Sequence, residues 1–159
     1  MADTDTHPLA GTFASPHHRL RVNLLYTATW LQDRIRAFLE PHDLTQPQFN
    51  ILRILRGQHR TGAGTLSTSC LRKRMIDRAS DTSRLVDRLV ARGLVSKQPC
   101  TEDRRRVDVR ITEAGLALLD EIDAGLAGLD AVTGALSDAD AERLNALLDR
   151  LHGFVPETA

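Results

Sequence analysis

The feature that most constrains the fold of this chain is a pair of short helical patterns separated by a turn. Ser67 suits a helix N-cap and begins the first pattern, which runs to about Met75. The turn occupies residues 76–80, and the second pattern runs from the end of this turn to Arg92. Gly93 follows, at the position where a glycine commonly ends a helix. This spacing predicts a helix-turn-helix.

A β-hairpin is predicted directly after the helix-turn-helix. Apolar and polar residues alternate in the runs 94–98 and 107–112, which is typical of short strands. The segment between them, 99–106, is too long for a tight turn and is rich in arginine. The order helix, turn, helix, hairpin is that of a winged helix, in which the hairpin forms the wing.

Helical patterns dominate the rest of the chain. Residues 17–39 carry an apolar stripe that ends before Pro41, and Thr45 with Gln48 predicts a capping box at the start of the next helix. Leucine and alanine supply much of the 42% hydrophobic content, whereas aromatic residues are only 4%. We therefore expect a mainly α fold with a small β-wing.

Two further helices are predicted after the hairpin. Thr112 caps the first, over residues 113–129, in which Gly125 and Gly128 mark a kink or a close helix crossing. Ser137 caps the second, which carries a leucine stripe.

The charge of the chain is zero overall but uneven along its length. Residues 71–110 contain twelve basic and six acidic side chains, whereas residues 111–159 contain two basic and ten acidic ones. Phosphate binding needs a locally positive surface rather than a positive total, so neutrality does not exclude nucleic-acid binding. An ordinary solvated helix face is the alternative explanation.

The second helix of the helix-turn-helix and the hairpin tip supply the candidate DNA contacts. A helix with short polar and basic side chains can enter the major groove, and a basic hairpin tip can reach the minor groove. The candidates are Ser80, Thr82, Ser83, Arg84 and Arg88 on the helix, and Arg104, Arg105 and Arg106 on the wing. Asp103 is expected to structure the wing by pairing with the tip arginines, because phosphate would repel its carboxylate. Solvent exposure alone is the alternative for Arg84 and Arg88.

These segments resemble the MarR family of winged helix-turn-helix transcriptional regulators. DRRRVDVRIT at 103–112 is similar to the family's wing signature, with Asp103, Arg105, Ile111 and Thr112 at the matching positions. Residues 83–95 resemble the family's recognition helix running into the wing, and residues 44–55 resemble its second helix. The resemblance covers roughly residues 20–150.

The resemblance implies a repressor that binds a palindromic operator in double-stranded DNA as a homodimer and is released by a small molecule or another signal. Its two recognition helices would lie about 34–36 Å apart. It also implies a single domain over 17–159. The residues before it, 1–16, are expected from their own sequence to form a disordered tail. In this domain, 45–112 forms the winged-helix lobe, and 17–40 and 113–155 form dimerisation helices, whose leucine stripes need a partner surface.

In this family the effector pocket lies between the dimerisation helices and the DNA-binding lobe. The residues that could line it are Tyr26, Trp30 and Met75, with His42 and Arg53 as polar partners. Core packing is the alternative for each of them, and it is favoured for Tyr26 and Met75.

The two cysteines are too few for a disulfide framework. Cys100 has basic neighbours that favour a thiolate, so it is a candidate redox residue, with a harmless surface thiol as the alternative. Cys70 is expected to be a small core residue. The six histidines show no metal-ligand spacing, so we expect no metal or other cofactor. No arrangement of nucleophile and base predicts an enzyme.

No membrane span and no secretory signal are predicted, which favours a cytoplasmic protein, associated with the nucleoid of a bacterium or archaeon. Two alternative functions remain open. One is a winged-helix module for protein–protein assembly, and the other is a cysteine-based redox regulator. Arginines rather than apolar residues at the wing tip favour DNA binding over the assembly module.

Overall fold

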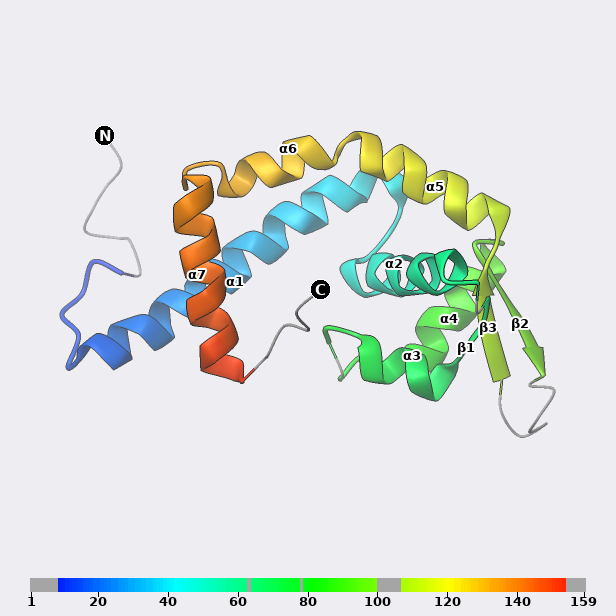
Figure 1. Ribbon diagram of the computed structural model, residues 1–159, viewed down its shortest axis with the longest axis horizontal. Coiled ribbons are helices and arrows are strands. Elements are labelled where there is room, and N and C mark those ends of the chain that lie inside the picture. The colour runs from blue at the N-terminus through cyan, green and yellow to red at the C-terminus, as the bar shows by residue number, and fades with distance from the viewer. Residues whose placement is uncertain (1–8, 63, 78, 100–106, 154–159) are drawn as a thin grey trace. The chain divides into compact units, whose positions relative to one another are not determined.

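The computed structural model describes residues 9–62, 64–77, 79–99 and 107–153. The chain divides into two compact units, with the boundary between Gly125 and Leu126. The elements of the first unit, drawn in Figure 1, are α1 (Pro16–Leu39), η1 (Glu40–His42), α2 (Gln46–Arg60), β1 (Leu66–Ser67), α3 (Thr68–Arg74), α4 (Thr82–Ala91), β2 (Val95–Pro99), β3 (Val107–Ile111) and α5 (Glu113–Ala124). Those of the second unit are α6 (Leu126–Asp130), η2 (Ala131–Thr133) and α7 (Asp138–His152). The mainly α fold with a small sheet is confirmed.

The helices begin where side-chain caps are available. The Thr45 side chain accepts the Gln48 N–H, and Gln48 Oε1 accepts the Thr45 N–H at 2.9 Å, so the predicted capping box is present. Ser67, Thr112 and Ser137 each accept the N–H of the residue three positions later, at the starts of α3, α5 and α7. These bonds satisfy backbone donors that have no partner inside the helix.

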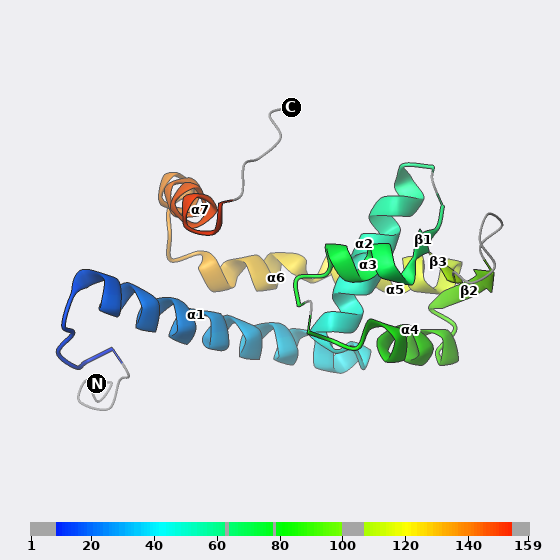
Figure 2. The ribbon, with the colours of Figure 1, turned by 90° about the horizontal axis from the view of Figure 1, so that it is seen from below.

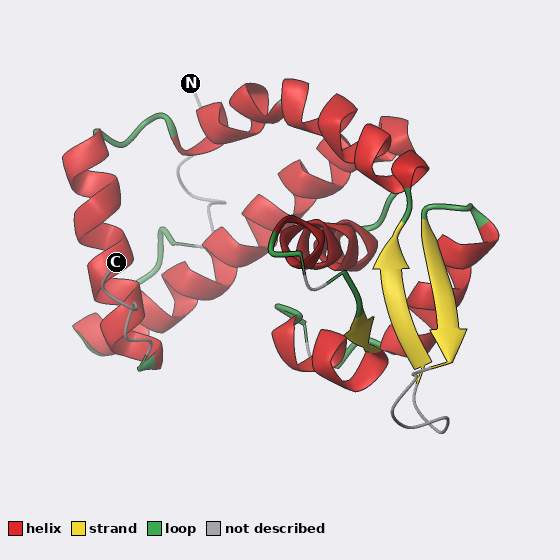
Figure 3. Cartoon of the chain, turned by 45° about the vertical axis from the view of Figure 1, so that its right-hand side comes forward, coloured by secondary structure: helices red, strands yellow, loops and turns green. Residues whose placement is uncertain are grey.

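The predicted hairpin is confirmed as an antiparallel pair of strands. Val95 of β2 lies opposite Ile111 of β3, and Pro99 lies opposite Val107 at the other end (Figure 3). β1 pairs with the other edge of β3, where Leu66 lies opposite Val109. β1 was not expected, because two residues are too short to show alternation. The wing tip, 100–106, lies outside the described residues.

One apolar core holds α2, α3, α4, the sheet and α5 together. Figure 2 shows α2, α3 and α4 packed against one another. The largest fully buried side chains are Leu39, Ile51, Leu52, Leu55, Leu71, Val86, Leu89, Val95, Val109, Leu119 and Ile122. Gly115 brings α5 close to the sheet, since a Cβ there would lie 2.3 Å from the Leu94 carbonyl oxygen. This packing fixes α4 within the lobe.

The helices at the two ends bury much less. Leu39, at its last turn, is the one buried residue of α1. No residue of α7 is buried, although Leu144, Leu147 and Leu151 recur at helical spacing. The helix predicted over 113–129 is interrupted, because α5 ends at Ala124 with Gly125 as its C-cap, and α6 begins at Leu126.

Candidate nucleic-acid interface

The exposed face of α4 carries polar and basic side chains. Val86 and Leu89 are completely buried and turn this helix toward the core. Ser83, Arg84 and Arg88 are exposed on the remaining surface. These three candidate DNA contacts thus lie on the free face of the helix, and their contact with DNA stays a prediction.

Two charge contacts shape this face. Arg84 Nε lies 3.2 Å from Asp81 Oδ2, and Asp81 Oδ1 also accepts the Arg84 N–H as the N-cap of α4. The Asp87 carboxylate contacts Lys97 Nζ of β2 and so ties the base of the wing to α4. Arg88 makes no ion pair with another described residue, so its guanidinium is available to a ligand.

The turn before α4 is held by side chains. The Asp77 carboxylate accepts the Ala79 N–H at 2.9 Å and the Ser80 hydroxyl at 2.6 Å. These hydrogen bonds, that of Ser80 first, hold the pKa of Asp77 below its ordinary value. Asn50 Oδ1 of α2 accepts the Ile76 N–H at 3.0 Å. The hydroxyl of Ser80, a candidate DNA contact, is thus committed to the turn.

Thr82 differs from the other candidate DNA contacts that the sequence predicts on α4. It is only 5% exposed, and its hydroxyl lies 3.3 Å from Met75 Sδ. The prediction that Thr82 contacts DNA from the exposed face of the helix is therefore wrong. Thr82 precedes Val86 by four residues and Leu89 by seven, so all three share the buried face of the helix. This spacing is visible in the sequence.

The last turn of α3 adds three cations that the sequence-based set did not include. Arg72, Lys73 and Arg74 are exposed there, and Arg74 Nη1 donates to Gln58 Oε1 at 2.9 Å. Their signal in the sequence was the basic surplus of residues 71–110. Arg104, Arg105, Arg106, Asp103 and Cys100 lie outside the described residues, so their roles stay predictions.

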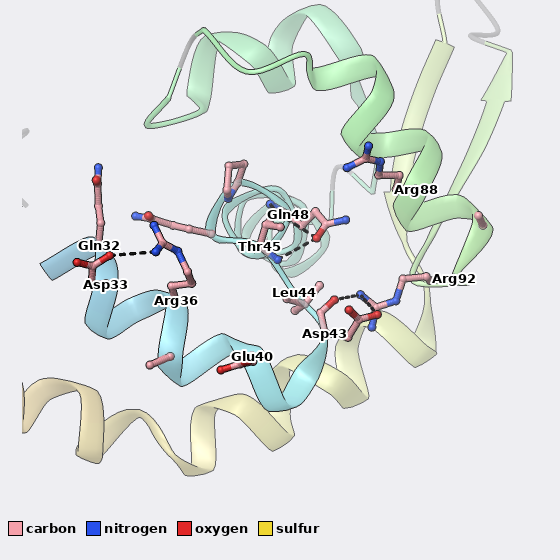
Figure 4. Close-up of a pocket in the computed structure, with 14 residues that line it drawn as sticks. Gln32, Asp33, Arg36, Glu40, Asp43, Leu44, Thr45, Gln48, Arg88 and Arg92 are labelled. Atoms are coloured by element: carbon pink, nitrogen blue, oxygen red, sulfur yellow. Dashed lines mark hydrogen bonds and ion pairs between the residues drawn. The ribbon is translucent and has the colours of Figure 1, made fainter. Parts of the chain in front are cut away.

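A cleft of about 1010 Å³ lies beside the C-terminal half of α4 (Figure 4). Its other walls are the end of α1, the segment after it and the start of α2. The charged side chains that line it are Asp33, Arg36, Glu40, Asp43, Arg88 and Arg92. Arg36 is paired with Asp33 at 3.0 Å, and Arg92 lies 3.9 Å from the Asp43 carboxylate. Of the arginines that line the cleft, Arg88 therefore has no ionic partner among the described residues.

The residues predicted for an effector pocket, none of which lines this cleft, are Tyr26, Trp30, His42, Arg53 and Met75. Met75 is 3% exposed and belongs to the core, which agrees with the core packing favoured for this residue from the sequence. Tyr26 and Trp30 are half-buried on α1. His42 and Arg53 instead contact acidic residues of α5.

A charge cluster joins α2 to α5. Arg56 is almost completely buried, and its Nη1 lies 2.7 Å from Asp123 Oδ2. Arg53 Nη1 donates to the other oxygen, Oδ1, at 3.1 Å. The close contact with Arg56 first, and then the positive charges of Arg56, Arg53 and Arg60, hold the pKa of Asp123 below its ordinary value. The cluster therefore contributes to the attachment of α5 to the lobe.

Metal-binding groups and membrane-spanning helices are both absent from the described residues. No group of three or more His, Cys, Asp or Glu side chains there could hold a metal ion. None of the helices in this part of the chain is both long enough and apolar enough to cross a membrane.

Comparison with known proteins identifies related chains. The model of the MarR family matches residues 44–107. The transcriptional repressor IacR of Pseudomonas putida is 30% identical over 116 residues, which are 72% of this chain and 66% of IacR. The multiple antibiotic resistance protein MarR of Escherichia coli is 29% identical over 99 residues, 62% of this chain and 65% of that protein. The aligned regions thus span slightly less than two thirds of each relative.

Solved structures of related proteins share the fold over nearly their whole length. A mutant MarR from E. coli, solved with operator DNA, is 25% identical with a TM-score of 0.70, over 81% of this chain and 91% of that one. BpsR of Bordetella bronchiseptica, whose DNA binding is regulated by 6-hydroxynicotinic acid, is 26% identical with a TM-score of 0.72, over 89% and 98%. These relatives are regulators rather than enzymes. The chain belongs to the MarR family of winged helix-turn-helix transcriptional regulators.

Proposed function

We propose that this protein binds a palindromic operator in double-stranded DNA as a homodimer and represses transcription in the cytoplasm. The observation that carries the proposal is the exposed face of α4, where Ser83, Arg84 and Arg88 lie opposite a fully buried apolar face. A helix held in this way can enter the major groove, where arginine recognises guanine by two hydrogen bonds. The relative solved with operator DNA and the relative named as a repressor support the proposal.

The uncovered leucines of the end helices support the proposed homodimer. Leu20 and Leu25 of α1 and the leucine stripe of α7 are exposed in the single chain. In the proposed dimer, residues 17–40 and 113–155 form the interface, and residues 45–112 form the DNA-binding lobe. Two such lobes about 34–36 Å apart would read successive major grooves of a palindrome.

We further propose that a small organic anion occupies the cleft beside α4 and releases the DNA. Arg88 lies both on the wall of this cleft and on the exposed face of α4. A carboxylate that binds its guanidinium would withdraw it from DNA. Regulation of BpsR by 6-hydroxynicotinic acid makes that compound a suitable first probe. An unchanged gel shift with that acid and with other aromatic carboxylates would count against this part of the proposal.

The test of DNA binding begins with selection of duplexes from a random pool by the full chain. Affinity for the selected duplex should fall steeply with salt, because bound cations release counterions from phosphates. Arg88→Ala should weaken binding by about 1–3 kcal/mol. Arg88→Lys should retain phosphate attraction but lose any bidentate contact to guanine.

The matched control is Arg60→Ala, which removes the same charge from an exposed position at the end of α2, outside the proposed dimer interface and the candidate DNA contacts. Its affinity should stay close to that of the wild type. Failure to enrich any duplex, or binding that is insensitive to salt, would overturn the proposal in favour of a protein-assembly module.

A further inference from the structure

Arg92 connects the end of α4 to a distant segment of the chain. Its backbone ends the helix, since its N–H donates to the Arg88 carbonyl at 3.2 Å and Gly93 follows with φ +70°. Its side chain extends away from the helix to the segment that follows α1 (Figure 4). The backbone and the side chain of one residue thus hold two different parts of the lobe.

The guanidinium of Arg92 donates hydrogen bonds to two successive backbone carbonyl groups. Nη2 donates to the His42 carbonyl oxygen at 3.1 Å, and Nη1 donates to the carbonyl oxygen of Asp43. The Asp43 carboxylate is 3.9 Å away and 94% exposed, so the carbonyls are the main partners. A planar fork with several donors fits this pair, whereas a lysine ammonium does not. We call this contact the Arg92 clasp.

The segment that receives the clasp is itself well anchored. Asp43 adopts a left-handed conformation with φ 51°, and its N–H donates to the Glu40 carbonyl at 3.0 Å. Leu44 is buried, and its N–H reaches the Leu39 carbonyl at 3.4 Å. On α5, Glu121 lies 3.5 Å from the His42 ring. The clasp therefore fastens α4 to a fixed point between α1 and α5.

We propose that Arg92 is a positioning residue for DNA reading, which sets the orientation of α4 through the carbonyls of His42 and Asp43. This inference rests on the proposed function. Recognition depends on side chains held within about 0.5 Å and 10–20° of their productive geometry. Releasing one end of a ten-residue helix displaces Arg84 and Arg88 at its surface without removing them.

The experiment compares wild type, Arg92→Ala and Arg92→Lys on two probes. One probe is the duplex selected by the wild type, and the other is a scrambled duplex of the same length. Arg92→Ala should lose about tenfold in affinity for the selected duplex, because two charge-assisted hydrogen bonds are removed. Affinity for the scrambled duplex and the slope with salt should stay unchanged, since Arg92 contacts no phosphate in this proposal.

Arg92→Lys keeps the positive charge but removes the planar fork of guanidinium donors. It should recover only part of the lost specificity, because one ammonium cannot span both carbonyls with the geometry of the fork. Complete recovery would show that the charge alone is required. Equal losses on both probes, with a salt slope reduced by about one, would mean direct phosphate contact and would overturn the proposal.

A second measurement needs no DNA. In Arg92→Ala, amide hydrogen exchange should accelerate at Asp43 and Leu44, whereas Leu52 and Leu89 in the core should stay protected. Unchanged exchange at residues 43 and 44 would overturn the clasp. If the wild type selects no duplex, the proposed function fails, and this measurement still decides whether Arg92 holds the end of α4. If Arg92→Ala does not fold, the same exchange comparison is made with Arg92→Lys.

Discussion

The winged-helix lobe, residues 45–112, and the helices at the two ends of the chain carry similar leucine stripes but bury them differently. Leu52, Leu71 and Leu89 in the lobe have no exposed surface. In α7, Leu144 is 44% exposed and Leu147 is 50% exposed. An amphipathic stripe therefore predicts a helix equally well in both regions. Whether the stripe is covered depends on a partner surface, and the α7 stripe is left exposed in the single chain.

The difference in leucine burial indicates which helices would gain stability from dimerisation. Fully burying a leucine side chain contributes about 1.5–3 kcal/mol, so covering a half-exposed leucine contributes roughly half of that. In a twofold dimer each such leucine occurs once in each protomer, so its contribution to the free energy of association counts twice. The lobe should thus owe its stability to its own core. The stability of the end helices should instead rise with protein concentration, because association covers their leucines.

The largest expected effect is on the lobe core, from Gly115→Ala. A Cβ at Gly115 would lie 2.3 Å from the Leu94 carbonyl oxygen, so the backbone of α5 or of the sheet must shift. The free energy of unfolding, measured by urea titration, should fall by about 3 kcal/mol.

The matched control is Gly57→Ala, in the interior of α2, where a Cβ would meet no atom within 4 Å. This substitution should stabilise the protein by about 0.5–1 kcal/mol, because alanine favours the helix. Equal effects of the two substitutions would mean that α5 does not pack closely on the lobe.

The next effect tests the end helices, through Leu144→Asp with Leu147→Asp. Two carboxylates on the α7 stripe should raise the dissociation constant of the proposed dimer by about 100-fold, or roughly 2.7 kcal/mol. Sedimentation equilibrium measures the change. The core amides of α2 and α4 should keep their protection from hydrogen exchange, because α7 lies outside the lobe.

Asn145→Asp is the control, since it places the same charge at an exposed polar position of α7. It should leave the association unchanged. A double variant that sediments like the wild type would show that the exposed leucines of α7 do not contribute to association.

A smaller effect is expected at the charge cluster between α2 and α5, from Asp123→Asn. This change leaves the buried Arg56 without its carboxylate partner and should cost about 2 kcal/mol at neutral pH, less than for a fully buried pair because Asp123 is 31% exposed. Arg56→Met should cost less, since it removes the buried charge itself. Urea titration compares both variants.

The cluster also predicts a pH dependence. The folded-state pKa of Asp123 lies below its ordinary value of 3.8, so this carboxylate contributes stability above that value. The contribution is lost as pH falls through the folded-state pKa. The wild type should therefore lose stability below about pH 4, and Asp123→Asn should lose less. Parallel pH profiles would show that Asp123 does not stabilise the fold through its charge.

Much of the lobe could be predicted because its signals are local. The capping box at Thr45, the cap at Thr112 and the alternation in β2 and β3 each depend on residues within a few positions of one another. The signal that Thr82 is buried was equally local, since Thr82 lies four residues before Val86 and so on the same face of the helix. The error arose from classifying this threonine by its polarity rather than by its position on the helix.

The sequence by itself determined the kinds of element, their order, most of their ends and the exposed arginines of α4. These follow from hydrogen bonds and periodicities that span at most one helical turn or one strand repeat. Only the tertiary structure decided that β1 pairs with β3, that Arg56 meets Asp123 and that Arg92 grips the carbonyls of His42 and Asp43. Each of these contacts joins residues far apart in the chain. Their meeting depends on how the whole lobe packs, which no local pattern records.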